Sequence, residues 1–78
     1  MKQISNFVRG AQIVKDYLSK VTNEPGVYFM YNIDKTILYI GKAKNLNKRI
    51  SSYSKPSNMS LRIQRMVSQI FSIDFITT

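Results

Sequence analysis

Two short apolar segments joined by a run of turn-forming residues limit the fold of this chain more than any other feature. Residues 26–31 read GVYFMY and residues 36–40 read TILYI, and both are rich in the aromatic and β-branched side chains typical of strands. Residues 32–35 (NIDK) supply turn-forming side chains between them. The spacing predicts a β-hairpin. Alternation along a strand leaves open whether Tyr28 and Tyr39 lie on the same face.

Helical periodicity is predicted on both sides of this hairpin. Apolar side chains recur with helical spacing over residues 4–20, which predicts an N-terminal packing helix that ends before Pro25 and Gly26. Leu46, Ile50 and Tyr53 share one face of a short helix that we expect to be capped near Asn45. A loop over residues 54–60 precedes a third helix over residues 61–71, capped by Ser60, and residues 73–77 form a last strand. The predicted order is α-β-β-α-α-β.

The charge of the chain is strongly basic and unevenly distributed. Twelve lysines and arginines face four acids, which gives a formal net charge of +8. This asymmetry favours a polyanionic partner, with nucleic acid first and an anionic membrane surface second, over a generally basic surface. No acid lies between Asp34 and Asp74, whereas this stretch contains Lys35, Lys42, Lys44, Lys48, Arg49, Lys55, Arg62 and Arg65.

Missing residue types exclude several kinds of chemistry. The chain has no cysteine and no histidine, so disulfides, thiolate zinc sites, cysteine nucleophiles and histidine bases are excluded. The apolar runs are far shorter than the ~20 residues that cross a bilayer, and the first residues lack the apolar core of a signal peptide. We therefore expect a cytoplasmic protein with no membrane partner. The acids open to catalysis are Asp16, Glu24, Asp34 and Asp74.

The basic stretch that follows the second strand has the chemistry of a phosphate site. Gly41 lets the backbone approach a ligand, and the adjacent Lys42 can neutralise an oxygen, although a turn glycine followed by a solvated lysine explains this pair equally well. Arg49 offers a planar fork that matches phosphate oxygens. A tyrosine beside such charges can lose its proton and act as a base, or it can simply pack at the rim of the core.

At this point two tyrosine–glycine segments resemble the two halves of a known motif. Residues 26–28 (GVY) and 39–41 (YIG) are similar to the motif of the GIY-YIG nuclease family. The flanking residues 24–28 (EPGVY) and 41–46 (GKAKNL) resemble the N-terminal nuclease domain of the UvrC-type excinucleases of bacteria. The resemblance runs from about Pro25 to the C-terminus, which gives an N-terminal helix over residues 1–22 and a sheet-and-helix core over residues 25–78 of a single domain.

The resemblance implies an α+β fold and a reaction. It implies a small three-stranded antiparallel sheet flanked by helices, and hydrolysis of a DNA phosphodiester on the 3′ side of a lesion in nucleotide excision repair and the SOS response. Carried over by position, Tyr39 is the general base, Tyr28 orients the attacking water or phosphate, Lys42 and Arg49 hold the scissile phosphate, and Tyr53 completes the site. It also implies one divalent metal ion, Mg²⁺ or Mn²⁺, and as partners DNA and the other excinuclease proteins, UvrB and, through it, UvrA. Lys44, Lys48, Lys55, Arg62 and Arg65 are expected to contact the DNA backbone.

The sequence departs from the family at the metal site. The family's metal-binding glutamate lies on a helix after the third strand, and none of the four acids falls at that position. We therefore expect a domain truncated at its C-terminus, with weak or no cleavage by this chain alone. Two alternatives stay open. The chain could be a non-catalytic nucleic-acid-binding module that lacks the metal site, or an interaction domain whose N-terminal helix docks a partner.

Overall fold

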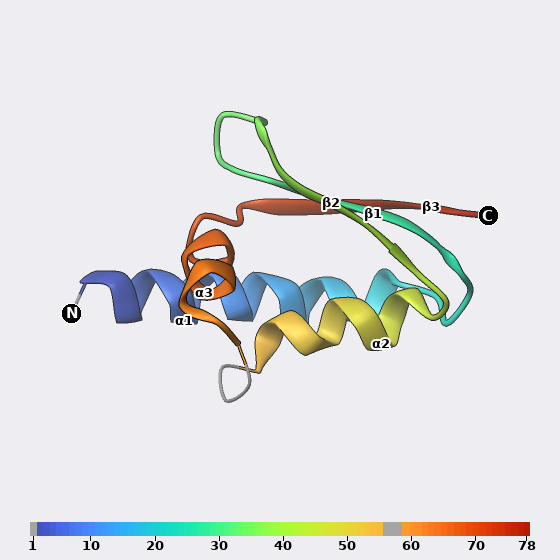
Figure 1. Cartoon of the computed structure of the whole chain (residues 1–78), viewed down its shortest axis with the longest axis horizontal. Helices are drawn as coiled ribbons and strands as arrows, with labels where there is room; N and C mark the ends of the chain where they lie inside the picture. The colour runs from blue at the N-terminus through green and yellow to red at the C-terminus, as the bar shows by residue number, and fades with distance from the viewer. Residues whose placement is uncertain (1, 56–58) are drawn as a thin grey trace.

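The computed structural model of the chain confirms the predicted order of elements (Figure 1). It describes residues 2–55 and 59–78, and side chains from Phe7 onward, so the predicted loop residues 56–58 and the side chain of Ile4 lie outside the described part. Two short 3₁₀ turns extend the first two helices. The elements are α1 (Lys2–Tyr17), η1 (Leu18–Lys20), β1 (Gly26–Tyr31), β2 (Ile37–Ala43), α2 (Leu46–Ser51), η2 (Ser52–Ser54), α3 (Leu61–Ser68) and β3 (Ser72–Thr77).

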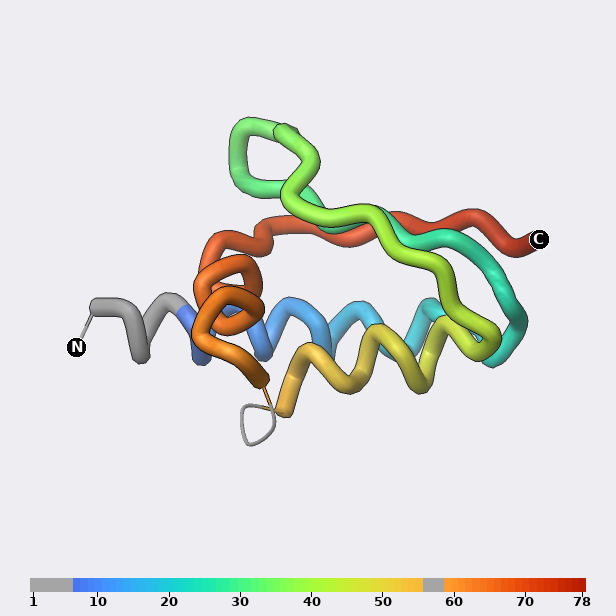
Figure 2. Tube along the Cα trace, in the orientation of Figure 1, coloured from blue at the N-terminus to red at the C-terminus, as the bar shows by residue number. Residues whose placement is uncertain are grey.

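The three strands form one antiparallel sheet with β1 in the centre. The strand order is β2-β1-β3, so the hairpin forms one side and the last strand pairs with the free edge of β1. Gly26 pairs with Ala43 on one side and with Thr77 on the other. The helices α1 and α2 run along one face of this sheet (Figure 2). The α+β fold with a three-stranded antiparallel sheet flanked by helices is therefore confirmed.

Both predicted helix caps are present. The side-chain oxygen of Asn45 accepts a hydrogen bond from the backbone N–H of Lys48 at 3.0 Å, and Ser60 Oγ accepts one from the N–H of Ile63 at 3.2 Å. Such caps satisfy donors that have no partner inside the helix. They fix where α2 and α3 begin and therefore where their side chains point.

The ends of the second strand and of the third helix differ from the prediction by three residues each. The second strand extends to Ala43, because residues 41–43 pair with residues 26–28 of β1 even though their side chains carry no strand pattern. The third helix ends at Ser68 instead of residue 71. Ile70 is fully buried just beyond that end, so its apolar character reflects core packing rather than a continuing helix.

The core lies between the sheet and the helices. Its fully buried side chains include Tyr28 and Met30 from β1, Leu46 and Ile50 from α2, and Val14 from α1. The apolar side of α1 therefore packs inside the molecule. None of the helices among the described residues is both long enough and apolar enough to cross a membrane.

The helices α1 and α3 approach each other closely. A Cβ atom at Gly10 of α1 would meet the backbone carbonyl of Val67, so only glycine permits this contact. The guanidinium of Arg9 donates hydrogen bonds to the carbonyls of Ser68 at 2.9 Å and Ile70 at 3.2 Å. These bonds satisfy carbonyls at and just after the end of α3 and hold it against α1.

Candidate active site

Three tyrosines from separate elements form a cluster on the helix side of the sheet. The ring centroids of Tyr28 and Tyr39 lie 6.1 Å apart, those of Tyr28 and Tyr53 lie 5.9 Å apart, and those of Tyr39 and Tyr53 lie 6.2 Å apart. Tyr28 pairs with Gly41 and Met30 pairs with Tyr39, so the two strand tyrosines are diagonal neighbours on one face. The structure thus resolves the question that strand alternation left open.

Tyr28 lies at the bottom of this cluster. Its side chain is fully buried, and its hydroxyl lies 2.7 Å from the hydroxyl of Tyr53 in a hydrogen bond that either oxygen can donate. Opposite Tyr28 on β2, a Cβ atom at Gly41 would collide with the phenol ring. The glycine of the second tyrosine–glycine segment therefore provides the space in which the tyrosine of the first segment sits.

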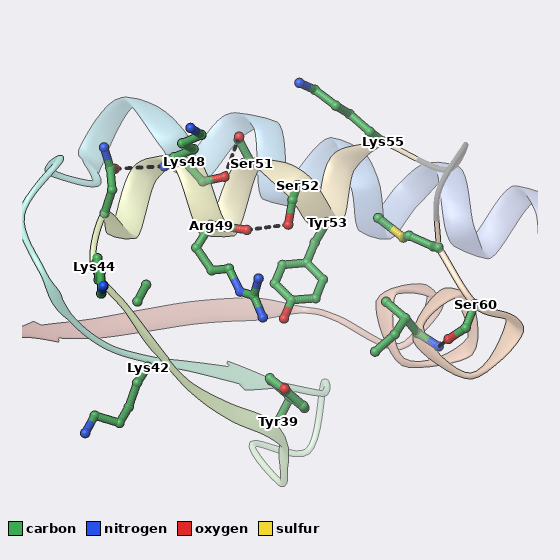
Figure 3. Close-up of a pocket in the computed structure, with 14 residues that line it drawn as sticks. Tyr39, Lys42, Lys44, Lys48, Arg49, Ser51, Ser52, Tyr53, Lys55 and Ser60 are labelled. Carbon is green, nitrogen blue, oxygen red and sulfur yellow. Dashed lines mark hydrogen bonds between the residues drawn. The ribbon is translucent and has the colours of Figure 1, made fainter.

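Arg49 projects from the exposed side of α2 toward the same cluster. It precedes Tyr53 by four residues, so both side chains lie on one helical face, and Figure 3 shows the guanidinium beside the Tyr53 ring. The Tyr28 hydroxyl first, and then Tyr53 and Tyr39, raise the pKa of Arg49. The arginine is therefore a permanent positive charge next to three phenols.

Tyr53 stays protonated in this environment. Burial is the largest cause that raises the pKa of Tyr53 far above its ordinary value, followed by the hydrogen bond with Tyr28, while Arg49 acts in the opposite direction. A phenol held in its neutral form can donate a hydrogen bond but cannot accept a proton from water. Of the three tyrosines, Tyr53 is thus suited to a structural or hydrogen-bonding role.

A large basic cavity opens above the cluster. Its volume is about 1220 Å³, and it lies between β2, α2 and the start of α3. Tyr39 and Tyr53 line it, whereas Tyr28 lies beneath it. Such a concentration of positive charge around phenol hydroxyls suits a phosphodiester. The basic side chains that line the cavity are Lys42, Lys44, Lys48, Arg49 and Lys55.

The other basic residues predicted for the site lie at the edge of the basic cavity or outside it. Lys42 borders the cavity, but it is exposed and its side chain points away from Arg49 and Tyr53 (Figure 3). Arg62 lines a second, smaller cavity beyond Tyr39. Arg65 lines neither cavity among the described residues. The structure therefore brings together Tyr28, Tyr39, Arg49 and Tyr53 but not the whole predicted set.

Several lining residues were not singled out as site residues from the sequence. The cap Asn45 carried a detectable signal for its position at the start of a helix, although not for its place in a site. Ile63 had no such signal, because α3 reaches the cavity only through the packing of the folded chain. The additional lining residues are Ala43, Asn45, Ser51, Ser52, Met59, Ser60 and Ile63.

The residues around the cavity do not suit a divalent cation. Magnesium prefers carboxylate oxygens and water, and the four acids Asp16, Glu24, Asp34 and Asp74 all lie outside both cavities. Within residues 2–55 and 59–78, no three histidine, cysteine or acidic side chains come together. The described residues that line the cavity offer phenol and serine oxygens but no carboxylate oxygen that could bind magnesium.

Fold and site together define a GIY-YIG domain. The family described as "UvrC-like GIY-YIG domain" matches residues 24–78, and the chain belongs to this family. The resemblance found from the two tyrosine–glycine segments is therefore confirmed.

Individual relatives agree with this assignment. UvrABC system protein C of Brucella abortus biovar 1 is 41% identical over 69 residues, which is 88% of this chain and 11% of that protein. The same protein of Cronobacter sakazakii is 45% identical over 64 residues, 82% of this chain and 10% of that protein. The chain thus spans about a tenth of the length of these curated relatives.

A solved structure shares the fold. The crystal structure of the GIY-YIG N-terminal endonuclease domain of UvrC from Thermotoga maritima, bound to its catalytic divalent cation magnesium, superposes with a TM-score of 0.71 and 29% identity. The match covers 83% of this chain and 70% of that chain.

Proposed function

We propose that this chain provides the catalytic core of a DNA endonuclease that hydrolyses one phosphodiester, on the 3′ side of a lesion, in nucleotide excision repair. The observation that carries the proposal is the convergence of Tyr28, Tyr39, Tyr53 and Arg49 on one basic cavity. The solved relative is an endonuclease domain, and the curated relatives are proteins of the UvrABC system.

Tyr39 is the proposed general base. It lines both cavities and is only half-buried, so its side chain can meet a bound ligand, in contrast to Tyr28, which is fully buried and lines neither cavity. In the proposed step, Tyr39 takes a proton from a water molecule whose oxygen attacks phosphorus. The bond from phosphorus to the leaving oxygen breaks, and the leaving oxygen gains a proton from solvent.

Arg49 is the proposed electrostatic partner of the scissile phosphate. Its fork can hold two phosphate oxygens and stabilise the negative charge that develops on them. Tyr28 acts as a positioning residue, because its buried hydroxyl holds Tyr53 and neighbours Arg49. Lys42 borders the cavity, and we propose that it contacts a DNA phosphate at the edge of the cavity.

The other basic residues are proposed to hold the DNA backbone. Contacts of this kind raise affinity and fix the position of the strand without reading its sequence. By analogy with the UvrABC relatives, the partners are DNA, UvrB and, through UvrB, UvrA, in the cytoplasm. The backbone contacts are Lys44, Lys48, Lys55, Arg62 and Arg65.

The described residues of this chain do not hold the metal ion that the complete reaction would use. One divalent cation, Mg²⁺ or Mn²⁺, would stabilise the charge of the reacting phosphate. Since the described residues bring no carboxylate to the cavity, we propose that its protein ligand comes from outside them. Residues 1–78 alone should then cleave weakly or not at all.

A nicking assay tests the proposal. Supercoiled plasmid is incubated with magnesium and either residues 1–78 or the same residues fused at their C-terminus to a segment that contains a glutamate. We expect nicking by the fusion and little by the unfused chain. Tyr39→Phe in the fusion should abolish nicking without changing DNA binding. Nicking that persists in Tyr39→Phe would overturn the role of Tyr39.

The lack of an acid at the cavity also favours a second function. A basic cavity that has no carboxylate among its described lining residues suits a module that binds nucleic acid without cutting it. The fused protein separates the two functions. Tight DNA binding with no nicking by the fusion supports the binding module and argues against the endonuclease.

A further inference from the structure

A β-bulge precedes the proposed base. Met30 of β1 pairs with Tyr39, but the next residue, Tyr31, pairs with Ile37, so Leu38 is an extra residue in β2. In a regular strand, Leu38 and Tyr39 would point to opposite faces. Here both side chains line the same small cavity, and both are half-buried. The bulge has therefore turned Leu38 toward the site, as bulges beside active sites do.

This second cavity continues the basic cavity. The two share Tyr39, Ser60 and Ile63, and the smaller one has a volume of about 520 Å³. Ser60 Oγ accepts the capping hydrogen bond from Ile63, and its O–H can still donate at the edge of the cavity. The remaining walls are apolar apart from one arginine. We call Leu38, Ile63 and Met66 the apolar shelf.

The positive charges beside the shelf define what can occupy it. The shelf adjoins Tyr39, beside the cavity lined by Arg49 and Lys55, and Arg62 also lines the small cavity. An apolar surface with cationic side chains beside it complements a nucleoside flanked by phosphates. The volume also falls in the range of about 300–1,000 Å³ typical of pockets for single small molecules.

We propose that the apolar shelf binds the unpaired nucleoside next to the scissile phosphate, with Arg62 on the phosphate that follows. This proposal rests on the proposed function, since it assumes that a phosphodiester occupies the site at Arg49. The shelf holds the base through apolar contact and reads no base edge. It accordingly favours DNA that is single-stranded or unstacked at the cut, without sequence preference.

Binding measurements on two matched probes test the shelf. One probe is a single-stranded oligonucleotide of thymidines, and the other is a chain of abasic deoxyribose phosphates of the same length. Both carry the same charge, so a difference in Kd by fluorescence anisotropy reports contact with the base alone. We expect the abasic probe to bind the wild-type chain about fivefold more weakly.

Two variants locate that contact. Leu38→Ala should weaken thymidine binding and leave abasic binding unchanged, so that the two Kd values converge. Ile37→Ala is the matched control, because Ile37 is adjacent on β2, 49% exposed and outside both cavities. It should preserve the wild-type ratio. Circular dichroism verifies that each variant is folded, and the wild-type comparison stands even if Leu38→Ala does not fold.

Each outcome bears on one proposal. If the wild type binds the two probes equally, the proposal that the apolar shelf binds a base is wrong, whatever the variants do. A preference for thymidines that Leu38→Ala and Ile37→Ala leave equally intact also overturns it. Separately, an Arg49→Gln variant that binds both probes as tightly as the wild type contradicts the phosphate site of the proposed function but not the preference for bases.

Discussion

The hydroxyl oxygens of Tyr28 and Tyr53 lie 2.7 Å apart at a point where both side chains are buried. This hydrogen bond joins the central strand of the sheet to the turn after α2. It therefore couples the sheet, which carries Tyr39, to the helix, which carries Arg49. This contact helps to set the position of the proposed base Tyr39 relative to Arg49.

Tyr28→Phe should cost more stability than Tyr53→Phe. The first change leaves the buried Tyr53 hydroxyl without its partner, and an unsatisfied buried polar group costs about 1–3 kcal/mol. The second leaves the Tyr28 hydroxyl beside the Arg49 guanidinium, so we expect a loss near the lower end of that range. Urea denaturation gives the free energy of unfolding of each variant. Equal losses, or a larger loss for Tyr53→Phe, would contradict the arrangement.

Gly41→Ala should disturb the site through Tyr28. The new methyl group would overlap the phenol ring, and overpacking of this kind costs about 1–3 kcal/mol. Near-UV circular dichroism should change, because the tyrosine rings shift relative to one another. Ile40→Ala, at the neighbouring residue that is 52% exposed, is the control and should leave the tyrosine signal unchanged. A Gly41→Ala protein with wild-type stability and spectrum would refute the prediction.

Stability should fall at alkaline pH because of Tyr53. Burial raises the pKa of Tyr53 above its unfolded value of about 10, so the folded state keeps the proton longer than the unfolded state. The contribution is complete below about pH 10 and is lost as the pH rises above it. Urea denaturation across this range should show a shallower decline for Tyr53→Phe than for the wild type. An identical decline in both proteins would show that Tyr53 titrates normally.

Ionisation of Tyr17 should also lower the stability of the fold at alkaline pH, independently of Tyr53. Burial, and then the negative charge of Asp74, raise the pKa of Tyr17, so its ionisation also opposes folding above about pH 10. Tyr17→Phe should therefore flatten the decline in stability by its own amount. The effects of Tyr17→Phe and Tyr53→Phe should add, since neither phenol contributes to the pKa shift of the other. Strong non-additivity in the double variant would contradict separate titrations.

DNA binding should weaken steeply with salt. A protein that contacts several phosphates loses affinity sharply between ~50 and ~200 mM salt, because bound counterions are released. Lys48→Gln should reduce the slope of log K against log salt by about one, since Lys48 lines the basic cavity. Lys15→Gln, at an exposed position of α1 outside both cavities, is the control. Equal effects of the two changes would argue against binding at the cavity.

Local signals predicted the elements but not how they meet. Asn45 and Ser60 mark helix starts because capping depends on neighbours only three residues away. The extension of β2 through Ala43 depends on pairing with Gly26, which is far away in the chain. Residues 41–43 carry a glycine and a lysine rather than a strand pattern, so pairing with β1 decides their conformation. Boundaries of this kind are set by tertiary contacts.

The candidate site was predictable where it depends on residue type. The tyrosines and Arg49 could be selected from the two tyrosine–glycine segments and the basic stretch that follows. The bulge at Leu38 could not, because it is a property of the register between two strands rather than of either strand alone. For the same reason, no local pattern indicates that Lys42 points away from Arg49 or that α3 brings Ile63 to the cavity.

The central position of β1 has a consequence for the synthesis of the protein. β1 carries Tyr28, and its second edge is completed only when β3 pairs along it, with Thr77 opposite Gly26. During translation, the tyrosines and Arg49 leave the ribosome well before this strand does. We expect a nascent chain without β3 to lack an ordered cluster of these tyrosines, so that the site forms only after the last strand is synthesised.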